Sequence, residues 1–244
     1  MENYLLILGA NSDIAKATAY RFAKEGYNLY LASRDIEKLE VIARDIEVRY
    51  KVKVKPLYFD ALDYLSHQRF YESLHPRPKG VVCAVGYLGN QIKAQSDFEE
   101  AKKIIDTNFT GCVSIFNIIA NDFEKRKYGF IVGISSVAGD RGRKSNYIYG
   151  SAKAAFTTYL SGLRNRLFKT GVHVITVKPG FVQTKMTQGM NLPKTLTAQP
   201  EEVAEDIYKA VKEKQDIVYT KWMWKYIMLI IKLIPEKIFK KMSL

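Results

Sequence analysis

A tyrosine, a lysine and a serine stand at a spacing that could support proton transfer. Tyr149 and Lys153 are four residues apart and share one face of any helix that contains both. An ammonium group beside a phenol favours the phenolate, which can exchange a proton with a carbonyl or alcohol oxygen. Ser136 precedes Tyr149 by thirteen residues, and its hydroxyl could hold that oxygen. The alternative is a tyrosine packed over a lysine stem on a helix surface.

A second group of residues could bind a phosphate-containing cofactor. Gly9 ends an apolar run and is followed by Asn11, Ser12, Asp13 and Ile14 at the start of a helical pattern. In an α/β fold this is where a dinucleotide pyrophosphate meets a helix N-terminus. Asp13 or Ser12 could also simply cap that helix.

The end of the second apolar run favours one nicotinamide cofactor over the other. Ser33 and Arg34 stand where an NAD site normally has an acid for the ribose 2′-hydroxyl. A guanidinium matches a 2′-phosphate, so the pair favours NADPH over NADH, with Lys38 as support one helical turn later. The alternative is a solvated arginine at a helix start. Asp60, after the third run, could accept from the adenine amino group or cap the next turn.

Short apolar runs alternate with longer helical patterns along most of the chain. This alternation predicts an α/β fold with one doubly wound, mostly parallel Rossmann-type sheet of seven strands and helices on both faces. The predicted strands are Tyr4–Gly9, Asn28–Ser33, Lys53–Phe59, Gly80–Val85, Gly129–Ser135, Val172–Lys178 and Asp216–Tyr219. The predicted helices are Asp13–Glu25, Asp35–Tyr50, Ser66–Leu74, Asp97–Lys127, Tyr147–Lys169 and Glu201–Lys214.

Length and composition indicate one folded domain with an appendage. The chain has 244 residues, of which 47% are hydrophobic and 26% charged, as in ordinary globular proteins. We expect a domain over residues 1–220, a lid at about 181–200 beside the strand ends, and an appendage over 221–244. Two cysteines and three dispersed histidines argue against a disulfide framework and a metal site, and favour a reducing cytoplasm.

The net charge of +13 would suit nucleic acid, polyphosphate ligands or an anionic membrane. No basic cluster accompanies an aromatic RNA-reading signature or a helix-turn-helix spacing, so nucleic-acid binding is not expected. Residues 221–244 contain six lysines and only one acidic residue, Glu236. If Lys221–Ile234 is helical, Lys221, Lys225 and Lys232 form one basic stripe beside a wide apolar surface. That surface packs on the domain or on a second subunit, or lies in an anionic membrane interface.

Taken in order, the motifs resemble those of the short-chain dehydrogenase/reductase family over residues 4–219. The resemblance rests on four segments in the family's order: Asp106-Thr107-Asn108-Phe109-Thr110-Gly111, Gly133-Ile134-Ser135-Ser136-Val137-Ala138-Gly139, Tyr149-Gly150-Ser151-Ala152-Lys153, and Lys178-Pro179-Gly180-Phe181-Val182-Gln183-Thr184.

The resemblance implies a role for each of four catalytic residues. Tyr149 would be the general acid in carbonyl reduction, and Ser136 would orient the carbonyl. Lys153 would bind the nicotinamide ribose and favour the phenolate, while Asn108 would hold a water that links the lysine to solvent. The implied cofactor site comprises Gly9, Asn11, Ser12, Asp13, Ile14, Ser33, Arg34, Asp60, Ala61, Ala84, Gly86, Tyr149, Lys153, Pro179, Gly180, Val182 and Thr184.

The basic, apolar tail and the turn Gly9–Ile14 are similar to those of family members that reduce keto-sugars on polyprenyl phosphates. This narrower resemblance predicts an NADPH-dependent carbonyl reductase or alcohol dehydrogenase that acts on an amphiphilic or lipid-linked carbonyl substrate near the inner face of a membrane. The long segments Asp97–Lys127 and Tyr147–Lys169 are similar to the family's dimerising helices and predict a homodimer or homotetramer. The alternative is a catalytically idle dinucleotide-binding interaction protein associated with a membrane surface.

Overall fold

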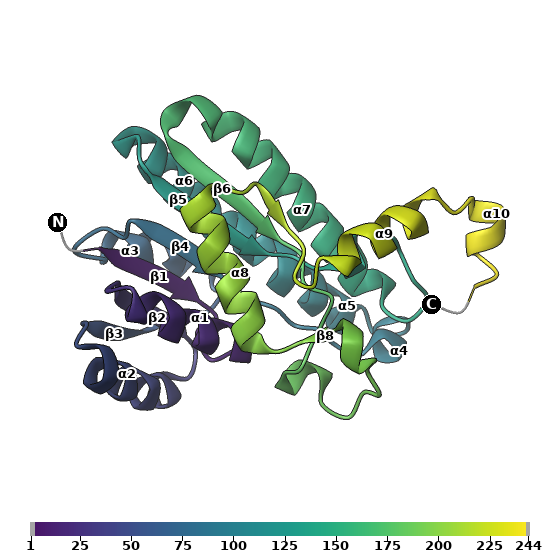
Figure 1. Ribbon diagram of the computed structural model, residues 1–244, viewed down its shortest axis with the longest axis horizontal. Helices are drawn as coiled ribbons and strands as arrows, with labels where there is room; N and C mark the ends of the chain where they lie inside the picture. The colour runs from purple at the N-terminus through teal and green to yellow at the C-terminus, as the bar shows by residue number, and fades with distance from the viewer. Residues whose placement is uncertain (1–2, 243–244) are drawn as a thin grey trace.

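A seven-stranded parallel sheet forms the centre of the protein. The computed structural model describes residues 3–242 (Figure 1). The strand order is β3-β2-β1-β4-β5-β6-β9, and every neighbouring pair is parallel. The strands are β1 (Tyr4–Leu8), β2 (Asn28–Ser33), β3 (Val54–Tyr58), β4 (Gly80–Cys83), β5 (Gly129–Ile134), β6 (Val172–Val177) and β9 (Ile217–Val218). The predicted doubly wound sheet is confirmed.

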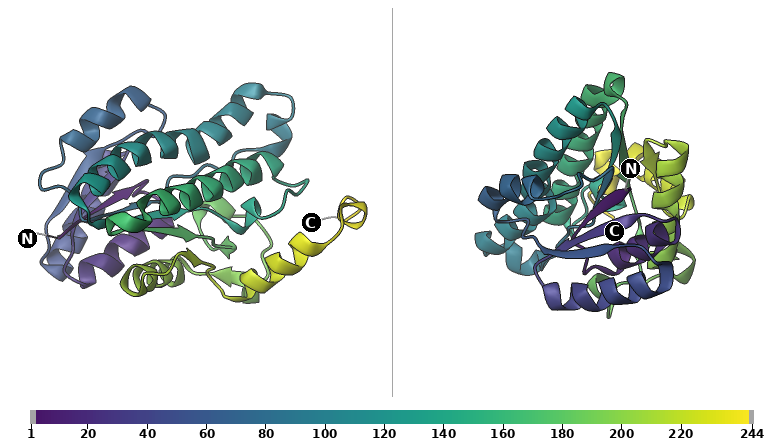
Figure 2. Two further views of the ribbon diagram at one scale, coloured as in Figure 1. Left: turned by 90° about the horizontal axis from the view of Figure 1, so that it is seen from above. Right: turned by 90° about the vertical axis from the view of Figure 1, so that its left-hand side faces the viewer.

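Both faces of the sheet are covered by helices, as Figure 2 shows. Leu5 and Ile7 of β1 belong to the core under α1 (Asp13–Lys24), α2 (Ile36–Tyr50) and α8 (Pro200–Glu213). Leu6 and Leu8 belong to the opposite core under α3 (His67–Glu72), α6 (Gly111–Arg126) and α7 (Tyr147–Leu167). Because successive side chains of a strand point to opposite faces, the apolar runs without polar alternation supply both cores at once.

The segment predicted as one helix over Asp97–Lys127 is interrupted. The structure has α5 (Phe98–Ile105), a π-helical turn η2 (Asp106–Thr110) and α6. The side-chain amide of Asn108 donates to the carbonyl oxygen of Ile104 at 2.8 Å, the acceptor that the backbone N–H of residue 108 would use in a regular helix. The single-helix prediction was therefore wrong at this turn. A short helix α4 (Gln91–Ala94), which was not predicted, precedes α5.

Residues 181–200 connect β6 to α8 at the carboxyl edge of the sheet. Their two ends form a separate two-stranded parallel sheet, in which β7 (Phe181–Val182) pairs with β8 (Thr197–Ala198). The chain between these strands is short turns, including η5 (Lys185–Thr187) and η6 (Lys194–Leu196).

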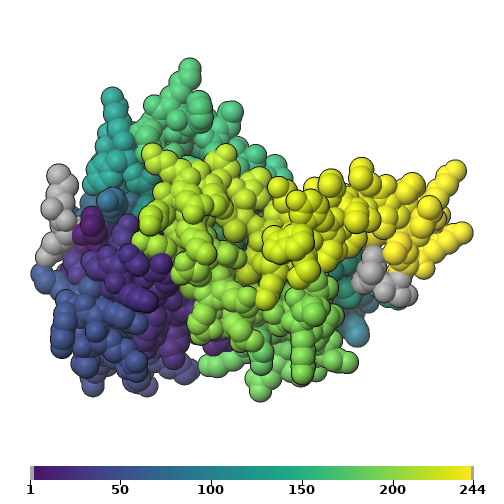
Figure 3. All heavy atoms as spheres, in the orientation of Figure 1, coloured from purple at the N-terminus to yellow at the C-terminus, as the bar shows by residue number. Residues whose placement is uncertain are grey.

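The C-terminal region forms two helices, α9 (Met223–Leu233) and α10 (Glu236–Phe239), that extend from one end of the molecule (Figure 3). Lys221 was predicted inside this helix, but its backbone is left-handed and its ammonium pairs with Glu202 of α8 at 2.7 Å. The prediction was therefore wrong for Lys221, which does not belong to the helix or to its basic stripe. Residues 243–244 of the predicted appendage lie outside the described residues. Within residues 3–242, no helix is both long and apolar enough to cross a bilayer.

The helix-covered core predicts a clear contrast between two phenylalanines. Phe22 of α1 is fully buried, and its ring contacts those of Tyr27, Phe130 and Tyr208. We expect Phe22→Ala to lower the free energy of unfolding by about 3–5 kcal/mol in urea titrations, because it removes these contacts and leaves a cavity. Phe168→Ala is the control, since that side chain is 79% exposed. Equal losses in the two variants would contradict this packing.

Candidate active site

Two consecutive serines at the end of β5 have different surroundings. The hydroxyl of Ser135 is buried, donates to the carbonyl oxygen of Lys153 at 3.0 Å and lies 2.7 Å from the Thr157 hydroxyl. Ser136 begins the short turn η3 (Val137–Gly139), and its Oγ accepts only a local hydrogen bond from the N–H of Ala138. Ser135 thus anchors β5 to α7, whereas Ser136 stands at the sheet edge, where a substrate oxygen could reach it.

Tyr149 and Lys153 lie one turn apart on α7, next to this edge. Lys153 is buried, its Nζ donates to the carbonyl oxygen of Ile134 at 3.0 Å, and it lies 5.7 Å from the centre of the Tyr149 ring. The phenol ring packs on the small apolar cluster around Ile104 of α5. The arrangement places a fixed positive charge beside a partly exposed phenol, which is what proton exchange with a bound carbonyl needs.

Asn108 joins the π-helical turn to the segment that follows β4. Its side chain is fully buried, donates to the carbonyl oxygen of Tyr87 at 2.6 Å and accepts from the N–H of Tyr87 at 3.2 Å. A methyl group on Gly86 would lie 3.5 Å from the Asn108 oxygen and 3.8 Å from the Lys153 ammonium. Asn108, Gly86 and Lys153 are therefore neighbours. Tyr87 was not among the predicted residues, because only its backbone takes part.

A cleft of about 340 Å³ opens where β1, β2, β3 and β4 end. It brings together nine of the predicted cofactor residues: Gly9, Asn11, Ser12, Ser33, Arg34, Asp60, Ala61, Ala84 and Gly86. Gly9 has a φ of +74°, and a side chain there would lie 2.8 Å from the backbone nitrogen of Val85. Only glycine lets the turn after β1 approach β4 this closely.

Several polar groups in this cleft suit a nucleotide. The amide nitrogen of Asn11 donates to Ser33 Oγ at 3.0 Å and to the Asp35 carbonyl oxygen, while its buried Oδ1 has no protein partner. An orphaned acceptor of this kind fits a ribose hydroxyl. Arg34 is exposed at the rim, where a phosphate would be reachable. Lys38, predicted as its support, pairs instead with Asp35 at 2.5 Å.

The hydrogen bonds of Ser12, Asp13 and Asp60 show which of these side chains cap a helix or a turn. Ser12 caps α1 by accepting from the N–H of Ala15 at 3.2 Å. Asp13 does not cap the helix, because its carboxylate accepts from the backbone N–H of Lys185 at 2.8 Å. Asp60 caps its own turn by accepting from the N–H of Leu62 at 3.0 Å.

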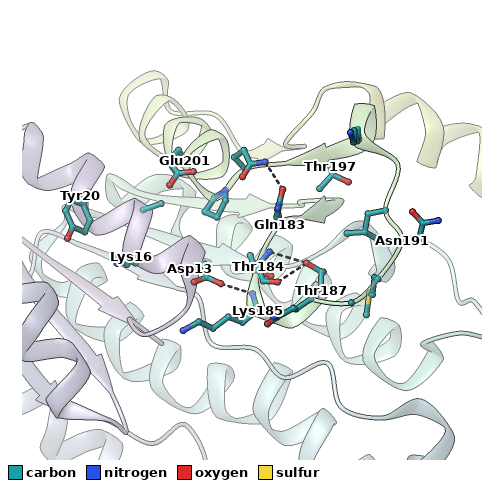
Figure 4. A pocket seen from close by; sticks show the side chains of 18 of the residues that line it. Asp13, Lys16, Tyr20, Gln183, Thr184, Lys185, Thr187, Asn191, Thr197 and Glu201 are labelled. Atoms are coloured by element: carbon teal, nitrogen blue, oxygen red, sulfur yellow. Dashed lines mark hydrogen bonds between the residues drawn. The ribbon is translucent and has the colours of Figure 1, made fainter.

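A second cavity, of about 1350 Å³, lies between α1 and residues 183–201 (Figure 4). Asp13 and Thr184 line it, and the hydrogen bond from Lys185 to Asp13 crosses it. Ile14 and the buried Val182 belong to the core beside this cavity. Of the remaining predicted cofactor residues, Asp13 and Thr184 thus line this cavity, whereas Pro179 lies beside the turn after Ser136.

The backbone of Pro179 and Gly180 packs on the turn η3 and on the C-terminal helix α9. The Pro179 carbonyl oxygen accepts from the N–H of Val137 at 3.1 Å. A side chain on Gly180 would overlap the Trp224 indole at 2.0 Å. Gly180 was predicted only as a cofactor residue, and in the structure its missing side chain makes room for Trp224 of α9.

A buried polar triad, which was not predicted, holds the ends of β5 and β6 together. Lys178 Nζ lies 2.5 Å from Asp140 Oδ1, with side chains only 7% and 5% exposed, and the Tyr219 hydroxyl donates to Asp140 Oδ2 at 3.0 Å. Burial and the Asp140 carboxylate raise the pKa of Tyr219. The signal that could have revealed the triad is a lysine at the end of an apolar strand, which needs a partner when buried.

The two cysteines form a buried contact in the core. Cys83 ends β4 and Cys112 lies in α6, with 3.7 Å between the sulfur atoms. The hydrogen bond with Cys83, together with burial, holds the pKa of the Cys112 thiol well above its usual range. Both thiols are buried in the core, where they pack as small apolar side chains. Among residues 3–242, no group of three acidic, histidine or cysteine side chains is arranged to hold a metal.

Comparison with known proteins defines the family. A family model described as short chain dehydrogenase matches residues 3–195. An uncharacterized oxidoreductase of Mycobacterium tuberculosis is 33% identical over 241 residues, covering 98% of this chain and 96% of that protein. The NADP-dependent 3-hydroxy acid dehydrogenase of Schizosaccharomyces pombe is 29% identical over 231 residues, covering 88% of each chain.

Among solved structures, a short-chain dehydrogenase from Sphingobium yanoikuyae in complex with NADPH superposes with a TM-score of 0.81 at 22% identity, covering 96% of this chain and 97% of that one. The chain belongs to the short-chain dehydrogenase family and is an oxidoreductase. None of these names mentions a lipid-linked keto-sugar, so that narrower resemblance stays a prediction.

The buried triad predicts an asymmetric effect of two substitutions. Lys178→Met should lower the free energy of unfolding by about 3–5 kcal/mol in urea titrations, because it leaves the Asp140 carboxylate buried without its cation. Adding Asp140→Asn should recover part of this loss, since the amide keeps an acceptor for Tyr219 without the charge. Lys209→Met is the control, because its pair with Glu205 is exposed. A double variant less stable than Lys178→Met would contradict this account.

Proposed function

We propose that the protein interconverts a carbonyl and a secondary alcohol with NADPH, using Tyr149 as the general acid and base. The observation that carries this proposal is the fixed Tyr149–Lys153 pair beside Ser136, at the same sheet edge as the nucleotide cleft. Oxidoreductase function follows from the family, and these side chains supply the proton chemistry that reduction of a carbonyl requires.

Each catalytic residue has a distinct proposed role. Ser136 donates a hydrogen bond to the substrate carbonyl and fixes its orientation. Tyr149 gives its phenolic proton to the oxygen as the carbon is reduced, and takes it back in the reverse direction. Lys153 stabilises the phenolate by charge and holds the nicotinamide ribose. Asn108 holds the segment around Gly86 and binds a water molecule that links Lys153 to solvent. When bound, NADPH supplies the hydride.

The proposed preference for NADPH rests on the residues at the end of β2. Arg34 lies at the open rim of the cleft, next to Ser33 and the orphaned oxygen of Asn11. A guanidinium is the side chain best suited to a 2′-phosphate. The names of the S. pombe relative and of the S. yanoikuyae structure, which mention NADP and NADPH, support the same cofactor. The proposed site also includes Pro179, Gly180, Val182 and Thr184 near the nicotinamide.

We further propose that residues 1–220 act as the catalytic domain and that residues 181–200 act as a lid. The lid is attached by the small sheet β7–β8 and touches α1 through the bond from Lys185 to Asp13. An amphiphilic or lipid-linked carbonyl compound is the proposed substrate class, because α9, which exposes apolar side chains, packs directly on this segment. Assembly into a homodimer or homotetramer through α5–α7 stays a prediction.

Tyr149→Phe tests the catalytic role. Removal of the hydroxyl should lower kcat for NADPH-dependent reduction of a small ketone by about 10²–10⁴-fold, the usual contribution of a general acid. NADPH binding, followed by cofactor fluorescence, should stay within about twofold, because the ring is retained. Tyr147→Phe, at the exposed start of the same helix, is the matched control. Unchanged turnover in Tyr149→Phe would refute the proposal.

Arg34→Ala tests the cofactor preference. Loss of the guanidinium should weaken NADPH binding by about 10–100-fold and leave NADH binding within about twofold, because only NADPH carries the 2′-phosphate. Arg44→Ala on the exposed side of α2 controls for a general loss of positive charge. Unchanged NADPH binding would leave Arg34 as a solvated arginine at the start of α2. Equal weakening of both cofactors would contradict a contact specific to the 2′-phosphate.

A further inference from the structure

Helix α9 has one face bound to the protein and one face that nothing in the described chain covers. On the inner face Trp224 and Met228 are buried against Val137, and the Trp224 indole donates to the Leu196 carbonyl oxygen at 3.0 Å. On the outer face five large side chains are exposed: Trp222 by 71%, Tyr226 by 55%, Leu229 by 51%, Ile230 by 64% and Leu233 by 73%.

The position of this helix is fixed by Arg141, from the loop after Ser136. The Arg141 guanidinium donates to the Lys232 carbonyl oxygen at 3.2 Å and to the Ile234 carbonyl oxygen at 3.3 Å, and it pairs with Glu236 at 2.7 Å. It also lies 4.3 Å from the centre of the Phe239 ring. The inner face and this cap hold α9 in place, so its outer face cannot turn toward the core.

The exposed side chains form one continuous apolar surface. With 3.6 residues per turn, Trp222, Tyr226, Leu229 and Leu233 fall within about 60° around the helix axis, and Ile230 lies next to them. The Trp222 and Tyr226 rings contact each other edge to face at 5.9 Å. On α10, Ile238 is 56% exposed as well. Soluble surfaces seldom gather so many large apolar side chains without a binding partner.

Lysines border this apolar surface. Lys225 and Lys232 follow one side of α9, and Lys237, Lys240 and Lys241 lie on or after α10. All five are exposed, and the one acidic residue among positions 222–242, Glu236, pairs with Arg141. An apolar helical face with aromatic rings and a lysine border matches an anionic bilayer interface, where apolar groups insert and ammonium groups meet lipid phosphates.

The charge pattern favours lipid over a second copy of the chain. In a two-fold symmetric dimer both protomers use the same surface, so each would bring its lysine border to one shared interface, where the positive charges repel. An anionic membrane instead offers charges of opposite sign. Helices α9 and α10 extend from one end of the molecule, where a flat surface can reach them (Figures 1 and 3).

We propose that the outer face of α9, with the lysines that border it, docks on anionic lipid and holds the active-site edge at the membrane surface. The inner face of the same helix touches residues 181–200 through Leu196 and the turn η3, directly after Ser136, through Val137. Docking therefore brings the site next to the layer in which an amphiphilic substrate dissolves. This proposal rests on the proposed function for its substrate class, but lipid binding itself is independent of turnover.

Vesicle flotation of the full chain tests the proposal. The chain should float with phosphatidylcholine vesicles that contain phosphatidylglycerol, and binding should fall at least about tenfold with phosphatidylcholine alone or in high salt. The double variant L229S/L233S, which removes inserted apolar surface, and K225E/K232E, which reverses the border charge, should each weaken binding at least about tenfold. L65S is the matched control, because Leu65 is 96% exposed on the distant turn η1 (Tyr64–Ser66).

Two further measurements make each outcome decisive. Far-ultraviolet circular dichroism and turnover of a soluble ketone should be unchanged in L229S/L233S, since both side chains are exposed. The Tyr149→Phe variant should float like the unaltered chain, so a failed enzyme proposal would leave this result in place. Failure of the unaltered chain to bind anionic vesicles would overturn the proposal. A dimer, seen by light scattering, that L229S/L233S dissociates while vesicle binding is absent would assign this face to a second copy.

Discussion

The hydrogen bond from the buried Lys153 ammonium to the Ile134 carbonyl oxygen holds α7 against the end of β5. A buried ammonium without a partner is costly, so this bond fixes the lysine and, one turn earlier, Tyr149. Ser135 adds a second attachment through the Lys153 carbonyl oxygen. Because parallel strands end at one common edge, Ser136, after β5, lies on the same edge of the sheet as the cleft where β1, β2, β3 and β4 end.

Features that are local in the sequence determined most of the fold. The seven strands were recognisable as apolar runs between helical patterns. Right-handed crossovers then account for their order, which runs outward in one direction from β1 to β3 and in the other from β4 to β9. The residues around Gly9 and Ser33 could likewise be assigned to one cleft, since each follows a strand end. Which side chain would cap α1 could not be predicted, because the bond that occupies Asp13 comes from Lys185, far away in the sequence.

The features that sequence reasoning missed depend on contacts between distant segments. Tyr219 and Asp140 are separated by 79 residues, and only the pairing of β6 with β9 brings them together. The contact of Trp224 with Gly180 depends in the same way on how α9 folds back over β7. Through Trp224, the C-terminal region contacts Val137 of the turn η3 and Leu196 of residues 181–200. Helix α9 is thus packed against both of the segments that border the candidate site.

Hydride transfer between NADPH and a carbonyl carbon is the reaction that we propose for the residues at this edge of the sheet. The most direct measurement is mass spectrometry of the product formed from a panel of ketones with NADPH that carries deuterium at both C4 positions of the dihydronicotinamide, so that transfer from either face is detected. We expect an alcohol that carries one deuterium at the former carbonyl carbon. If NADPH binds but neither hydrophilic nor amphiphilic ketones give a deuterated alcohol, the proposed hydride transfer is contradicted.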